Sequence, residues 1–144
     1  MKNLETLNQT DREKLLKFPA YISLLASNND TGLDEVGRAA AIKFSHIKTF
    51  SCDPMLFNFY QQANQVFEDN ITTLDMELPE KKAEREDAIK LALEELETIL
   101  KKLGKNYAIV MHRSMKSFKD HISKSHHSVL ESFIFPIPIK GLTY

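Results

Sequence analysis

The placement of glycine and proline constrains this chain more than any other feature. Only four Gly and five Pro occur in the 144 residues. Between them, apolar residues recur every three to four positions, as one buried face of an α-helix requires. The sequence therefore predicts an all-α, single-domain bundle of five to six helices over residues 1–144. The breaks between helices are expected at Gly32, Pro54, Pro79, Gly104 and the pair Pro136 and Pro138.

Capping and breaking residues predict the boundaries of the first two helices. Thr10 and Glu13 have the spacing of a capping box, which predicts a short helix to about Lys17. Pro19 lacks a backbone N–H and disfavours helical geometry in the residue before it. We therefore expect a second helix to begin at Pro19 and to end at about Ala26.

The long helices have their own start and stop signals. Asp53 as N-cap and Pro54 at the first helical position predict a helix to about Leu78. Pro79 is expected to open the next helix, which Gly104 ends. A helix that continues through Gly104 is the alternative, because the apolar stripe stays in phase across it.

The two ends of the chain differ from this pattern. Residues 1–9 are expected to be a flexible N-terminus. A last helix reaches about Val129, and a tail over 134–144 is expected to be extended because it contains Pro136 and Pro138. Since the large apolar side chains of the tail would form an exposed patch, we expect it to pack on its own bundle or against a second subunit.

Composition limits the class of protein. A net charge of −1 and a mean hydropathy of −0.33 are ordinary for a globular protein and carry no general signature of nucleic-acid binding. The first residues lack an apolar signal region, and no stretch is apolar enough to span a membrane. Cys52 is the single cysteine, which suits a reducing compartment. We therefore expect a cytoplasmic protein.

Charge is divided unevenly along the second half. Residues 68–97 contain eleven acids and four bases, and residues 101–124 contain seven bases and one acid. A solvated helix face explains the regular spacing of these acids. The complementary charge predicts two neighbouring helices with matching faces, and the alternative is a basic patch for an anionic partner.

Histidines are concentrated near the C-terminus, at His112, His121, His126 and His127. At about 100° and 1.5 Å per residue, a single helix separates them around and along its axis, so they cannot share one ion. We therefore expect exposed histidines beside lysines. The alternative is a transition-metal site with further partners, centred on His126, His127 and Glu131.

Acidic residues gather in the turn that follows the second predicted helix. Asp30, Asp34 and Glu35 are close enough in sequence to share one cation. Their carboxylate oxygens suit Ca²⁺ or Mg²⁺ better than Zn²⁺. The other interpretation is a polar turn in which Asp34 caps the next helix.

This segment resembles the TerB-like domains of the tellurite-resistance group over residues 19–49. In that family a helix ends in Leu-Leu-Ala, an acidic Asp-Gly turn follows, and a further Asp opens the next helix. Here the Leu-Leu-Ala of residues 24–26 precedes Asp30, Gly32 and Asp34, with Gly32 one position later than usual. The resemblance implies an all-helical fold, a stress-response context and metal binding by the acidic turn.

Taken together, these patterns predict a non-enzymatic cytoplasmic protein. We expect a stress-associated or interaction module that binds a protein partner or a second copy of itself, and a divalent cation at residues 30–35. The alternative function is a metalloprotein with the histidine-rich site near the C-terminal helix.

Overall fold

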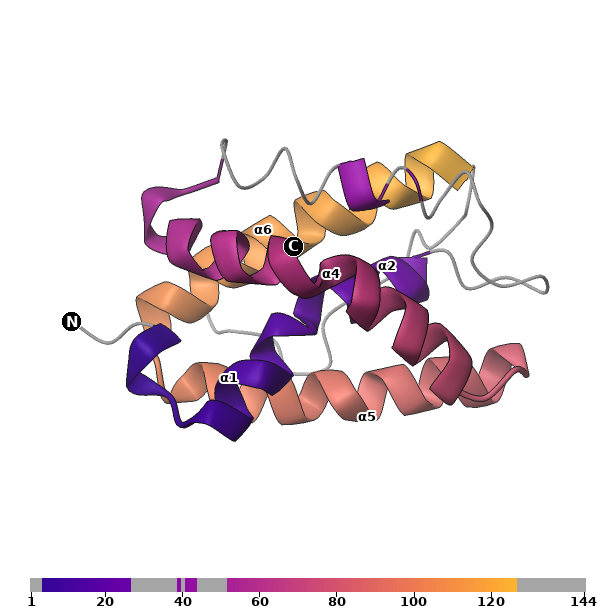
Figure 1. The fold of residues 1–144 in the computed structure, drawn as a ribbon, viewed down its shortest axis with the longest axis horizontal. Helices are drawn as coiled ribbons and strands as arrows, with labels where there is room; N and C mark the ends of the chain where they lie inside the picture. Colours follow the sequence, from indigo (N-terminus) through magenta and orange to yellow (C-terminus); the bar gives the residue numbers. More distant parts are fainter. Residues whose placement is uncertain (1–3, 27–38, 40, 44–51, 127–144) are drawn as a thin grey trace.

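The computed structural model describes residues 4–26, 39, 41–43 and 52–126, and every element in these ranges is helical (Figure 1). The prediction of an all-α bundle is therefore confirmed. The elements are η1 (Leu4–Thr6), α1 (Gln9–Leu16), α2 (Phe18–Ala26), η2 (Pro54–Leu56), α4 (Phe57–Glu77), α5 (Lys82–Lys101) and α6 (Lys105–His126). The predicted tail over 134–144 lies outside the described residues.

Helix α2 forms the centre of the bundle. Each of its residues except Tyr21 is buried, so it is apolar nearly all round, as a helix enclosed by others must be. It contacts α4, α5 and α6, and its contact with α6 is the most extensive. Figure 1 shows α2 in the middle of the view, with α5 along the lower edge.

The long helices α4 and α6 both pack on α2 and complete the core. The predicted stripe of α4 is buried, including Tyr60, Ala63 and Phe67. The ring of Phe67 meets that of Phe118 on α6, with centroids 5.9 Å apart. The predicted cap is found at η2, which leads into α4, because the Asp53 side chain accepts a hydrogen bond from the Met55 N–H at 2.9 Å. The α-helix itself begins later than predicted, at Phe57, and has no side-chain cap.

The N-terminal end of α1 differs from the expected capping box. The cap is Asn8, whose Oδ1 accepts from the Asp11 N–H at 2.7 Å, and Thr10 lies inside the first turn. Because Thr10 is already helical, it does not occupy the position from which a side chain caps the first turn. The break at the end of α1 is confirmed, since α1 ends at Leu16 and α2 begins at Phe18, next to Pro19.

Residues 4–8 are docked on the bundle, which corrects the expectation of a flexible N-terminus over residues 1–9. Leu4 and Leu7 are 1% and 6% exposed. Glu5 accepts from Asn58 at 3.1 Å and from Gln62 at 2.8 Å, both on α4. Two buried leucines offset the entropy of ordering such a short segment.

Arg85 joins the end of α4 to the start of α5. Its guanidinium donates to the carbonyl oxygens of Asp75 and Pro79 at 3.3 and 3.2 Å and pairs with the Asp75 carboxylate. These carbonyls belong to the last turn of α4 and the residues after it, which have no helical partner. Pro79 therefore lies in the connection that follows α4, and α5 begins later than predicted, at Lys82.

Gly104 separates α5 from α6. Its φ of 96° lies in the left-handed region, which glycine adopts without steric cost. The predicted end of the helix at Gly104 is confirmed, and the alternative of one continuous helix is wrong.

We expect Gly104→Ala to lower the free energy of unfolding by roughly 1–2 kcal/mol, because an L-residue is strained at this φ. An added Cβ would meet no atom within 4 Å, so the backbone alone accounts for the loss. Gly104→Asn should lose less, since Asn tolerates this region better. Urea denaturation measures both variants. Equal stability of the alanine variant and the wild type would contradict this assignment.

Candidate functional site

A glutamate and a histidine are paired inside the bundle, between α5 and α6. His112 is 0% exposed and Glu97 is 3% exposed. The His112 Nε2–H donates to Glu97 Oε2 at 2.8 Å, and Glu97 Oε1 lies 2.6 Å from the same nitrogen without hydrogen-bond alignment. The pair is thus a charge-assisted contact in a water-excluded interior.

Helical spacing explains why both side chains point inward. Glu97 lies one turn from Leu93 and within one turn of Leu100, which are buried on α5. His112 has the same relation to Ala108 and Met115, which are buried on α6. Residues three or four apart share a face, so the apolar stripes carry the polar pair into the core.

This pair corrects two expectations from the sequence. His112 is not an exposed histidine beside lysines, and Glu97 does not belong to a solvated helix face. The signal that could have found them is their position in phase with the apolar stripes. Glu97 and His112 are sealed from solvent and do not line a described cavity.

A second buried polar contact joins α4 to α6. The hydroxyls of Tyr60 and Ser114 are hydrogen-bonded, and Tyr60 is fully buried. Burial raises the pKa of Tyr60 well above its usual range, and the bond to Ser114 offsets this only in part. Cys52 lies half-buried against the core.

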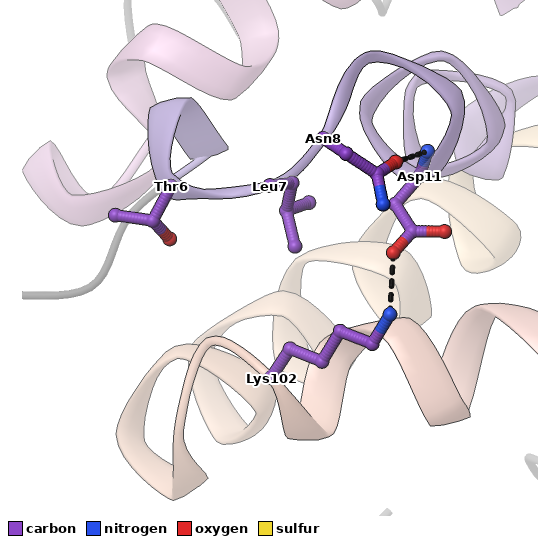
Figure 2. A pocket seen from close by; sticks show the side chains of 5 residues that line it. All are labelled: Thr6, Leu7, Asn8, Asp11 and Lys102. Carbon is purple, nitrogen blue, oxygen red and sulfur yellow. Dashed lines mark hydrogen bonds and ion pairs between the residues drawn. The ribbon is translucent and has the colours of Figure 1, made fainter.

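An open hollow of about 520 Å³ lies where the N-terminal segment meets the turn between α5 and α6. Its lining residues are Thr6, Leu7, Asn8, Asp11 and Lys102. Figure 2 shows Lys102 reaching across to Asp11, with Nζ and Oδ2 2.5 Å apart. Lys102 and Asp11 are the charged side chains that line this hollow, and they bind each other. Their contact holds α1 against the end of α5.

The predicted metal ligands are not placed by the structure. Asp30, Asp34 and Glu35 lie outside the described residues, as do His127 and Glu131. His126 is the last residue of α6, and its side chain is not described. Among the described residues, no group of three or more His, Cys, Asp or Glu side chains could hold a metal ion.

Across the described ranges, none of the helices has the length and apolar character that crossing a membrane needs. No family model, curated protein or solved structure matches the chain. The fold and its interior define an all-α bundle around one apolar helix, and the TerB-like resemblance stays a prediction.

Proposed function

We propose that this chain is a non-enzymatic helical interaction module that binds a basic partner on the outward face of α5. The observation that carries the proposal is Leu91, a large apolar side chain that is 67% exposed in the middle of that face. Exposed acids surround it at Glu84, Asp87 and Glu94. We call these four residues the α5 stripe.

The geometry of α5 supports this surface. At about 100° per residue, the four side chains of the stripe fall within an arc of about 80°. An apolar centre inside a charged border is the usual composition of a protein-binding surface. The pair of Glu97 and His112, in contrast, is buried and sealed from solvent.

A short oligolysine peptide is a suitable probe for this proposal. We expect it to bind wild-type protein and to lose binding when the stripe is reversed in the triple variant Glu84→Lys, Asp87→Lys, Glu94→Lys. The matched control reverses three other exposed acids, Glu13→Lys, Glu68→Lys and Asp69→Lys, and should bind like the wild type. Fluorescence anisotropy at low salt measures both, and equal loss in the two variants would contradict a specific surface.

The stress-associated role and the cation at residues 30–35 belong to the same proposal and rest on the sequence. Saturating Ca²⁺ should raise the melting temperature, because a ligand at 100 times its Kd stabilises by about 2.7 kcal/mol. The double variant Asp30→Ala, Asp34→Ala should abolish the shift. No shift in the wild type would make the turn structural only.

Metal analysis of protein purified without a His tag is the control for that experiment. Bound zinc or iron would favour the alternative site at His126, His127 and Glu131 over the acidic turn. The same analysis of a His127→Ala variant then identifies the ligand, because loss of the metal must follow loss of the imidazole.

A further inference from the structure

The outer face of α6 carries a basic counterpart of the α5 stripe. Lys105 and Arg113 are exposed, and Ile109 and Lys116 are partly exposed. At about 100° per residue, these four side chains also fall within an arc of about 80°. We call them the α6 stripe, and like the α5 stripe it has three charges around one apolar side chain.

The spacing of the two stripes matches when the helices are antiparallel. Along α5 the intervals from residue 84 to 94 are three, four and three, and along α6 the intervals from residue 116 back to 105 are three, four and four. This register sets the acids opposite the bases. The facing pairs are Glu84 with Lys116, Asp87 with Arg113, Leu91 with Ile109 and Glu94 with Lys105.

A parallel arrangement lacks this match. It would set Asp87 against Ile109 and Leu91 against Arg113, so that the apolar side chains no longer meet and only the outer acids face bases. The antiparallel register therefore joins apolar to apolar and acid to base along about 15 Å of helix.

The two stripes do not pair within one chain. α5 and α6 face each other through the buried contact of Glu97 with His112. The side chains of Glu84, Asp87, Leu91 and Glu94 are exposed, so they point away from that contact. The complementary charge seen in the sequence is thus displayed outward rather than used between neighbouring helices.

Neighbouring charges mark the borders of the stripes. Lys90, next to the α5 stripe, is paired with Glu86 at 3.2 Å, and Glu95 is paired with Lys14 on α1. Beyond the α6 stripe, Asp120 is paired with Lys119 at 2.9 Å.

We propose that the occupant of the α5 stripe is the α6 stripe of a second copy of this chain. This inference rests on the proposed function and names its partner. Each copy carries one stripe of each kind. The copies therefore form either a closed oligomer or an open chain, depending on how the two stripes are oriented on the molecule. Exposed charge pairs are screened by salt, so association is weak and salt-sensitive.

A charge-swap experiment with the full chain tests the inference. Wild-type protein should show a mass above that of the monomer in sedimentation equilibrium at low salt, and should become monomeric at about 1 M NaCl, where the screening length is about 3 Å. The α5-reversal variant defined above should be monomeric. The α6-reversal variant Lys105→Glu, Arg113→Glu, Lys116→Glu should be monomeric as well.

Mixing the two reversal variants is the decisive step. One then carries two basic stripes and the other two acidic stripes, so both kinds of contact become complementary again and the mixture should associate. The matched control variant should associate like the wild type, and helical circular dichroism should be the same in all variants. A mixture that stays monomeric overturns the inference.

The outcomes also separate this inference from the proposed function. If wild-type protein is monomeric at low salt and at every concentration but oligolysine binds through the α5 stripe, the second copy is wrong and the binding surface stands. If neither is seen, both proposals fail.

Discussion

The variant His112→Leu should lose about 3–5 kcal/mol of the free energy of unfolding, because it leaves the carboxylate of Glu97 buried without its donor. An uncompensated charge in the interior is among the largest destabilising effects of a single substitution. The variant Glu97→Leu should lose less, about 1–3 kcal/mol, since it removes the buried carboxylate itself and leaves no uncompensated charge in the interior. Urea denaturation measures both losses.

The double variant Glu97→Leu, His112→Leu tests the buried pair more directly than either single variant. Replacing a buried ion pair by apolar residues of similar volume is often neutral or stabilising, so the double variant should be more stable than His112→Leu alone. The exposed pair Glu86 and Lys90 is the matched control, and each single alanine variant there should change stability by about 0.5 kcal/mol or less. If the loss in the double variant equals the sum of the losses in Glu97→Leu and His112→Leu, the two side chains do not stabilise each other and the assignment of the pair is wrong.

The protein should lose stability steeply above about pH 10, the ordinary value for tyrosine, because its tyrosines titrate late in the folded state. Burial raises the pKa of Tyr60 and of Tyr107 well above the usual range. Burial also raises the pKa of the half-buried Tyr21, with a further contribution from Glu95.

The sign follows from proton counts. Above pH 10 the unfolded chain has lost its tyrosine protons while the buried Tyr60 and Tyr107 of the folded protein still hold theirs, so folding becomes less favourable as pH rises. Each fully buried tyrosine lowers the free energy of unfolding by about 1.4 kcal/mol for each pH unit above the pKa of tyrosine in the unfolded chain. Below that pKa the tyrosines do not change stability with pH.

Phenylalanine variants separate the tyrosines from the other alkaline effects. Tyr60→Phe and Tyr107→Phe should each remove about 1.4 kcal/mol per pH unit from the slope between pH 10 and 11. Tyr60→Phe also leaves Ser114 without this partner, so its stability at pH 7 should be lower than the wild type. Denaturation at a series of pH values gives these slopes. Identical slopes in the variants and the wild type would rule out the linkage.

The helices and most of their ends could be predicted because the signals are local. Pro19, Asp53 and Gly104 act through their own backbone or through an N–H two residues away, so each prediction needs only neighbouring residues. The start of α5 was predicted wrongly because it also depends on a contact between two helices. Arg85 binds the residues at the end of α4, and this contact, which no periodicity shows, sets Pro79 apart from α5.

The buried site could not be predicted for a related reason. Periodicity places Glu97 and His112 in phase with the apolar stripes, but a charged residue in that position is stable only when another element supplies its partner. Until α5 and α6 are packed, an exposed glutamate and an exposed histidine are the better expectation. The same holds for Leu4 and Leu7, whose burial depends on the surface that the other helices form.

By itself, the sequence determined that the described part of the chain is helical, that helices break next to Pro19 and at Gly104, and which face of each is apolar, because these properties arise within one or two turns of backbone. Only the tertiary structure decided that α2 is enclosed by the others, that Glu97 meets His112, and that the stripes of α5 and α6 face outward. Those outcomes depend on contacts between residues far apart in the chain. Their free energy comes from burying surfaces together, which no local pattern encodes.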